Sequence, residues 1–249
     1  MVMIILFKSF LALISALMGA GSTFLIKLNH KKLCALISLS AGALLGAAAF
    51  ILVPESSQQL GIFELILSVV SGYLVFWVIS KYYSHVCPAC SASHFDEQTT
   101  KKFSEIFLTL FTALAFHSLL DGVAISAGGW HSHEKQNSIF LAILTHKFPE
   151  GLALASLMLG AGLQKSKIIL YTILVESTTL LGSLIGIYFL KEGISLFWIS
   201  ILMAHIAGGF IYLAIHAVIG ELLKHHKALV IISLLAGLLL ILFVHLLID

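Results

Sequence analysis

The sequence predicts an all-α integral membrane protein with eight transmembrane helices. Of the 249 residues, 59% are hydrophobic and only 10% are charged, whereas a soluble domain carries about 25% charged residues. The apolar residues gather in eight runs, each close to or above the ~20 residues that cross a bilayer. All but one of the connections are short, so the whole chain, 1–249, is expected to form a single transmembrane domain embedded in a lipid bilayer.

The eight expected helices follow one another with one long connection. They cover about residues 2–26, 33–53, 60–80, 103–128, 138–162, 167–190, 194–219 and 228–248. The long connection, residues 81–102, is polar and is expected in the cytosol. The first run has the position of a signal peptide, but it is long and its basic residue, Lys8, follows mostly apolar residues. A signal peptide starts with basic residues and has a shorter apolar core, so a retained helix is favoured.

The lysines predict the orientation of the chain. All 14 basic residues are lysines. If the N-terminus lies outside, the cytosolic connections hold ten of them and the outer loops hold two, Lys135 and Lys191. Positive residues gather on the cytosolic side of membrane proteins. Both termini are therefore expected outside, across a bacterial inner membrane or a eukaryotic plasma or organelle membrane. No basic run suggests a nucleic-acid partner.

Two internal repetitions predict inverted repeats. The first, at an offset of 29, relates the fourth and fifth helices through His117-x-x-x-Asp121-Gly122 and His146-x-x-x-Glu150-Gly151. The second, at an offset of 166, relates the second and seventh helices through Ala41-Gly42 with Pro54-Glu55 and Ala207-Gly208 with Gly220-Glu221. Helices one to three would then match six to eight in the opposite direction, as in many secondary transporters. The alternative for the second repetition is close helix packing through small residues.

The fourth and fifth helices each carry a histidine four residues before a carboxylate. The pairs are His117 with Asp121 and His146 with Glu150. Residues at i and i+4 share one helix face. Two such faces offer two imidazoles and two carboxylates, a ligand set for a divalent transition metal. Because ionisable residues at membrane depth are costly and mark functional sites, we expect a metal site here.

Three neighbouring residues strengthen this expectation. Pro149 has no N–H to donate to the carbonyl of Thr145, beside His146, and irregular backbone at membrane depth lines a cavity or is buried in protein. Glu176 lies midway along the sixth helix, and Lys147 lies next to His146. A buried ammonium or carboxylate needs a partner. The sequence therefore predicts an ion pair between Lys147 and Glu176 beside the metal site.

The His-x-x-x-Asp-Gly and His-x-x-Pro-Glu-Gly strings give the chain a specific resemblance to the ZIP (Zrt/Irt-like protein) family of divalent metal transporters. The resemblance extends over most of the chain, through eight helices, outer termini, a polar loop after the third helix, and Ala-Gly-rich second and seventh helices. It implies metal-binding positions at His117, Ser118, Asp121, His146, Lys147, Glu150 and Glu176. It also implies a homodimer.

Two positions depart from the two-metal pattern of the better-known family members. Ser118 stands where many members have Asn, and Lys147 stands where many have Asn or Asp. Serine is a poor ligand and an ammonium binds no cation. We therefore expect one metal, held by His117, Asp121 and their counterparts on the fifth helix, with Lys147 balancing the carboxylate charge.

Residues away from this centre have weaker patterns. A transport path is one interpretation of His205, His216 and Glu221 toward the inside and of Glu55 toward the outside; hydrogen-bonded histidines and helix-end glutamates are the alternative. Several loop residues have side chains that bind zinc in other proteins, so these loops could bind metal ions. The alternative is that they are ordinary exposed loop residues. These are His85, Cys87, Cys90 and His94 inside, His131, His133 and Glu134 outside, and His225 and His226 inside.

The function expected from these observations is transport of a divalent metal ion into the cytosol by alternating access. Zn²⁺ is the favoured substrate, and Cd²⁺, Fe²⁺, Mn²⁺ and Co²⁺ fit the same ligands. One alternative is an intramembrane zinc-dependent hydrolase; the chain has no His-Glu-x-x-His string and no separate general base is evident. A cation-diffusion exporter is another, although six helices and a soluble metal-binding tail are usual there.

Overall fold

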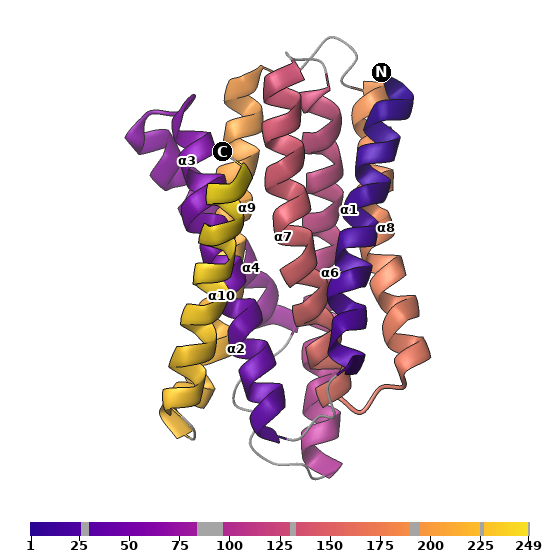
Figure 1. The fold of residues 1–249 in the computed structure, drawn as a ribbon, viewed down its shortest axis with the longest axis vertical. Coiled ribbons are helices and arrows are strands. Elements are labelled where there is room, and N and C mark those ends of the chain that lie inside the picture. The colour runs from indigo at the N-terminus through magenta and orange to yellow at the C-terminus, as the bar shows by residue number, and fades with distance from the viewer. Residues whose placement is uncertain (26–29, 84–96, 130–132, 190–194, 225–226, 249) are drawn as a thin grey trace.

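The computed structural model describes residues 1–25, 30–83, 97–129, 133–189, 195–224 and 227–248 (Figure 1). These residues form helices and contain no strand, which confirms the all-α class. The long helices are α1 (Val2–Ser22), α2 (His30–Gly46), α4 (Ile62–Tyr83), α6 (Glu97–Gly128), α7 (His133–Gly160), α8 (Lys165–Phe189), α9 (Leu196–Lys224) and α10 (Lys227–Ile248). Three shorter helical segments are η1 (Thr23–Leu25), η2 (Ala47–Leu52) and α3 (Val53–Ser57).

Six segments among the described residues are long and apolar enough to cross a membrane. They are Val2–Leu25, Cys34–Ser57, Ile62–Ile79, Lys165–Phe189, Leu196–His216 and Lys227–Leu246. The chain is therefore a multi-pass integral membrane protein. Two further helices, α6 and α7, run alongside these six (Figure 1). The total of eight crossings stays a prediction.

The second membrane span continues past the residue at which the sequence predicted its end. Residues 47–52 form a π-helical turn, η2, and α3 then carries the helix through Pro54 to Ser57. Proline has no N–H to donate and its ring crowds the carbonyl four residues earlier, here that of Phe50. The wider π turn, which pairs residues i and i+5, accommodates this defect without ending the helix.

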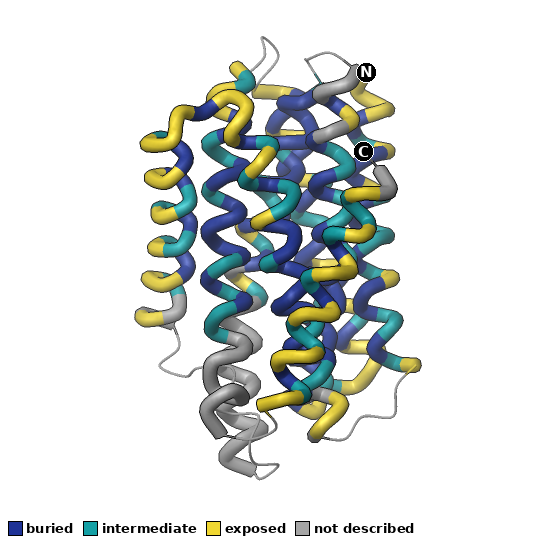
Figure 2. The backbone as a smooth tube through the Cα atoms, turned by 60° about the vertical axis from the view of Figure 1, so that its left-hand side comes forward, coloured by how far each residue is buried: buried dark blue, intermediate teal, exposed yellow. Residues whose placement is uncertain are grey.

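The long helices pack as two groups of four. The first group contains α1, α6, α7 and α8, and the second contains α2, α4, α9 and α10, as their closest mutual contacts show (Figure 1). We call these the first and second units. Between them lies the largest apolar core, which includes Ala47, Ile125, Ile143 and Met203. Figure 2 shows buried residues filling the interior, while exposed stretches lie along outer helices. Most of these exposed residues on α4 and α10 are large and apolar, as a lipid-facing surface requires.

Glycines bring the helices of each unit into backbone contact. In each of four helix pairs, a glycine on either helix faces a backbone carbonyl of the other, so closely that an added Cβ would overlap the carbonyl oxygen. The pairs are α1–α7 (Gly19 and Gly151), α6–α8 (Gly122 and Gly182), α2–α10 (Gly42 and Gly237) and α4–α9 (Gly72 and Gly208). Small residues allow such approach between membrane helices. In each pair, both helices therefore contribute a glycine that lets the two backbones touch.

Hydrogen bonds join the helices within the first unit. Ser183 Oγ on α8 donates to the carbonyl of Gly122 on α6 at 2.9 Å, and it lies 2.6 Å from Ser9 Oγ on α1. Lys8 Nζ on α1 donates to Asn137 Oδ1 on α7 at 2.9 Å. These bonds connect all four helices of the unit, which carries the polar cluster described next.

Candidate metal centre

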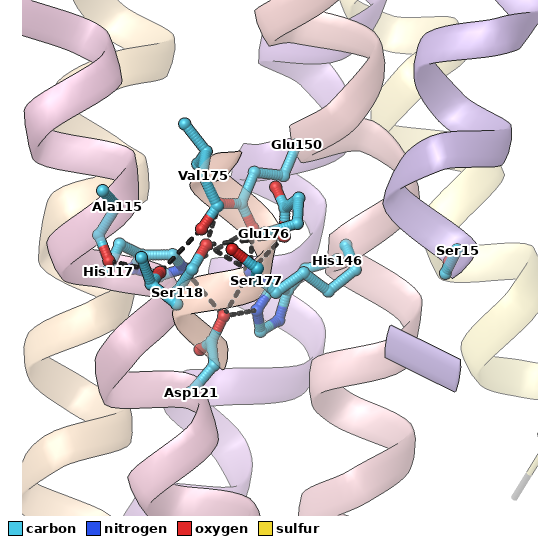
Figure 3. A network of polar contacts seen from close by, with 12 residues as sticks. Ser15, Ala115, His117, Ser118, Asp121, His146, Glu150, Val175, Glu176 and Ser177 are labelled. Atoms are coloured by element: carbon cyan, nitrogen blue, oxygen red, sulfur yellow. Dashed lines mark hydrogen bonds and ion pairs between the residues drawn. The ribbon is translucent and has the colours of Figure 1, made fainter. Parts of the chain in front are cut away.

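The polar residues predicted near mid-membrane meet at one point of the first unit (Figure 3). Helix α6 contributes His117, Ser118 and Asp121, because residues spaced by three or four share a helix face. Helix α7 contributes a matching group, and α8 contributes a single carboxylate. These are His146, Lys147, Glu150 and Glu176. Each of the seven side chains is at most 1% exposed.

Four of these side chains can converge on a metal ion. One ligand atom each from His117, Asp121, His146 and Glu150 can be chosen so that all four atoms lie within 4.8 Å of one another. Asp121 Oδ2 lies 3.4 Å from His117 Nε2 and 3.3 Å from His146 Nε2. Glu150 Oε2 lies 3.9 Å from His117 Nε2. Two imidazoles and two carboxylates at these distances match a tetrahedral zinc site after small side-chain shifts.

Lys147 lies at the centre of the carboxylates. Its Nζ is 2.9 Å from Asp121 Oδ2, 2.9 Å from Glu150 Oε2 and 2.9 Å from Glu176 Oε2. It also donates to Ser118 Oγ at 2.7 Å. The predicted ion pair between Lys147 and Glu176 is confirmed, and it belongs to a larger network. A fully buried ammonium requires such compensation.

Ser118 connects the three helices of the cluster. Its hydroxyl donates to Glu150 Oε1 at 3.1 Å and lies 3.5 Å from Glu176 Oε2. It accepts the hydrogen bond from Lys147. Serine is a poor metal ligand, but Ser118 has three polar neighbours here. Its hydroxyl holds the Lys147 ammonium between α6 and α8.

Several buried polar atoms of the cluster have no hydrogen-bond partner among the described residues. They are His117 Nε2, Asp121 Oδ1, His146 Nδ1 and Glu176 Oε1, together with Glu150 Oε2, which is ion-paired with Lys147. Buried polar atoms in proteins are otherwise almost always paired, and an exception calls for an explanation such as an ion. His117 Nε2 is also one of the atoms near the proposed ligand oxygens, so its lone pair suits a cation.

The formal charge of the cluster matches one divalent cation. With the carboxyl groups ionised and the imidazoles neutral, the three carboxylates contribute −3 and Lys147 contributes +1, which leaves −2. A single divalent ion brings this to zero. A second would leave an excess of +2 in a buried, low-dielectric site, which is strongly unfavourable.

Phe210 covers the cluster from the second unit, which the sequence analysis did not predict. This residue of α9 is fully buried, and its ring centroid lies 4.5 Å from that of His117 and 4.9 Å from that of His146. The ring seals both imidazoles against the apolar core. The one available signal was an aromatic residue directly after the small residues 207–209.

Three of the proposed path residues, His205, His216 and Glu55, have their polar contacts outside the metal cluster. His205 Nδ1 is 2.8 Å from Ser71 Oγ, so this part of α9 faces α4. His216 Nδ1 is 2.9 Å from the carbonyl of Tyr212, and the two rings stack at 3.9 Å. Glu55 Oε2 accepts a hydrogen bond from Gln58 Nε2 at 3.2 Å near the end of α3. Polar partners are thus present for all three, and their role in transport stays a prediction.

The remaining candidate ligands fall outside the part of the chain that the structure describes. His85, Cys87, Cys90, His94, His131, His225 and His226 lie outside the described residues. His133, Glu134 and Glu221 belong to described helices, but their side chains do not belong to the described part. The loop and inner-path proposals for these residues therefore stay predictions.

Pro149, inside α7, lines an apolar cavity beside the cluster. The cavity has a volume of about 310 Å³ and lies among α1, α2, α7 and α10. Thr145, whose carbonyl faces the missing N–H of Pro149, is also part of its wall. None of the four proposed ligands lines it. The cavity therefore borders both units without being the metal centre.

Comparison with known proteins adds a family and two relatives. The family described as ZIP zinc transporter matches residues 84–245, which include all of α6, α7 and α8. An uncharacterized protein of Methanocaldococcus jannaschii is 28% identical over 180 residues, which cover 72% of this chain and 72% of that protein. An uncharacterized zinc transporter of Schizosaccharomyces pombe is 26% identical over 142 residues, 53% of this chain. This chain covers 31% of the length of that second relative.

Proposed function

Because the chain belongs to the ZIP zinc transporter family, we propose that it carries a divalent metal ion, zinc foremost, into the cytosol through the site on α6 and α7. The observation that carries this proposal is the buried convergence of His117, Asp121, His146 and Glu150, with ligand atoms within 4.8 Å of one another. Family membership fits a metal-ion transporter rather than an enzyme.

The ligand set supports zinc without restricting the site to it. Imidazole and carboxylate ligands suit Zn²⁺, and Cd²⁺, Fe²⁺, Mn²⁺ and Co²⁺ accept the same donors. The S. pombe relative is named a zinc transporter. We propose that the site holds one ion at a time, since Lys147 takes the place of a second cation and the formal charge of −2 is neutralised by one divalent ion.

The arrangement of the two units supports alternating access. All seven polar residues of the cluster belong to α6, α7 and α8 of the first unit, whereas the second unit contributes the apolar ring of Phe210. The core between the units is also apolar. Movement of one unit along such a surface breaks few polar contacts, so the site can face either side of the membrane in turn.

The glycine contacts support the proposed inverted repeats. If α1, α2 and α4 correspond to α8, α9 and α10, and α6 corresponds to α7, every glycine of the four tight pairs has a counterpart. Gly19 corresponds to Gly182, Gly42 to Gly208, Gly72 to Gly237 and Gly122 to Gly151. The correspondence also turns the pair α1–α7 into α8–α6 and α2–α10 into α9–α4. Such reciprocity favours inverted repeats over the alternative in which small residues serve close helix packing alone.

The hydrolase alternative gains no support from the family match. A hydrolase would need a water-activating group beside the metal, whereas the carboxylate nearest to such a role, Glu176, is ion-paired with Lys147. A homodimer and the orientation with both termini outside stay proposals, the second of which rests on the lysine distribution.

Flux into proteoliposomes tests the proposed function. The purified protein should carry radioactive zinc into vesicles, and His117→Ala should abolish this flux because it removes one of four ligands. His245→Ala is the matched control, since that histidine lies in the last turn of α10, in the second unit. Absence of flux in the wild type together with turnover of peptide or lipid would favour the hydrolase.

A further inference from the structure

We propose that Lys147 is a tethered cation that exchanges with the transported metal ion for Asp121 and Glu150, so that the empty transporter can reorient without another cation. This inference rests on the proposed function and deepens it. It assigns to Lys147 a part in each transport cycle, beyond a fixed contribution to the charge of the site.

The acceptors of Lys147 fall into two classes. Asp121 Oδ2 and Glu150 Oε2 each lie 2.9 Å from Nζ, and both residues belong to the four proposed metal ligands. Ser118 Oγ at 2.7 Å and Glu176 Oε2 at 2.9 Å do not belong to that ligand set. The ammonium therefore shares half of its partners with the metal and keeps the other half for itself.

Two cations on the same carboxylate oxygens repel each other strongly at low dielectric. When a metal ion binds Asp121 and Glu150, the ammonium is driven toward Ser118 and Glu176, where two partners remain. The flexible four-carbon stem of lysine permits a shift of this size. When the metal leaves, the ammonium returns to the two freed carboxylates.

This exchange solves a problem of the empty site. Three carboxylates at membrane depth, each 0% exposed, would carry −3 without Lys147. Removing one partner of a buried ion pair leaves an uncompensated charge, which is strongly destabilising. The apolar core and Phe210 would have to close over that charge whenever the unloaded protein reorients. With Lys147 present, a cation is always available.

Two kinds of flux separate this role from a structural one. Net zinc uptake into zinc-free vesicles requires the empty protein to return, whereas exchange of labelled for unlabelled zinc requires only the loaded protein to move. In Lys147→Met, net uptake should fall by about tenfold or more, while exchange stays within about twofold of the wild type. Equal losses of both fluxes would contradict the proposal.

Equilibrium zinc binding in detergent gives a readout that needs no transport. Lys147→Met should bind zinc about tenfold more tightly or better, because the metal no longer has to displace an ammonium from two of its ligands. Unchanged or weaker zinc binding in a folded variant would overturn the exchange.

Charge-matched variants keep the test decisive if Lys147→Met folds poorly. The double variant Lys147→Met with Glu176→Gln restores the formal charge of −2 but supplies no cation to Asp121 and Glu150, so its ratio of net uptake to exchange should stay low. Lys147→Arg retains the cation and should also retain that ratio. A double variant whose net uptake recovers to the wild-type level would refute the proposal, because the total charge alone would then suffice.

Lys8→Met is the matched control. Lys8 is also a buried lysine, 9% exposed, but its partner is Asn137 rather than the metal cluster. Its substitution should leave the ratio of net uptake to exchange unchanged. Failure of the proposed function itself would look different, because the wild type would then show neither flux nor zinc binding.

Discussion

Among single residues, Asp121 has the most consequential position. One oxygen, Oδ2, lies within 3.4 Å of both histidines of the cluster and 2.9 Å from the ammonium of Lys147. Its carboxylate therefore joins the two halves of the repeated motif. Any loss of charge at this atom affects three neighbours at the same time.

The variant Asp121→Asn tests this position at nearly constant shape. The amide removes a negative charge from a buried site, so the zinc dissociation constant should rise by about 100-fold or more. Isothermal titration calorimetry in detergent measures it. Glu64→Gln, which makes the same change on α4 in the second unit, should leave the constant unchanged. Similar weakening in both variants would contradict the assignment.

How far such residues follow from sequence depends on whether their placement is local. His117 and Asp121 share a helix face at any i, i+4 spacing, and the repeated string predicted their meeting with His146 and Glu150. Phe210 could not be found this way, because the face that α9 turns toward α6 and α7 depends on how the two units pack. The network around Ser118 likewise requires α8 to lie beside both other helices.

At the scale of helices, the apolar runs predicted where a helix is present better than where it begins and ends. The run expected at 103–128 belongs to a helix that begins at Glu97, and the run expected to end at 53 continues as helix to Ser57. Hydropathy detects the apolar part of a helix, while its backbone hydrogen bonds continue into polar residues. The second run ended directly before Pro54, and the π turn that lets the helix continue through this proline is not visible in hydropathy.

The tight helix pairs predict that alanine lowers thermal stability at a glycine in a helix contact but not at a glycine outside one. In Gly237→Ala, the new Cβ would overlap the carbonyl oxygen of Leu39, so α10 must move away from α2. Overpacking of this kind costs about 1–3 kcal/mol, and the thermal unfolding midpoint in detergent should fall.

Gly21→Ala is the control for that measurement. An added Cβ at Gly21 meets no atom within 4 Å, and alanine favours helix over glycine by about 1 kcal/mol. The midpoint of this variant should stay the same or rise. A fall of equal size in both variants would show that the backbone contact of α10 with α2 is not the cause.

At the scale of the whole molecule, the two units differ in polarity, and the lysine asymmetry predicts how both are oriented in the membrane. The first unit carries the polar cluster, and the second presents an apolar surface to it. The lysine distribution in turn predicts which end of both units faces the cytosol.

Cysteine labelling in intact cells tests that orientation. After replacement of Cys34, Cys87 and Cys90, single cysteines are introduced at the exposed positions Gln59 and Gln164. The first follows α3 and the second precedes α8, at opposite ends of the molecule (Figure 1). A membrane-impermeant maleimide should label position 59 from outside and position 164 only after permeabilisation. The reverse pattern would invert the predicted topology.

The glycine pairs also limit how this protein can change over time. At each tight contact the obstacle to a larger residue is a main-chain carbonyl, such as that of Thr179 opposite Gly122. Every amino acid carries that carbonyl, so no substitution on the facing helix can make room for a new side chain. Second-site suppressors of a Gly122 variant should therefore be absent from its contact position on α8 and arise only where they let whole helices shift.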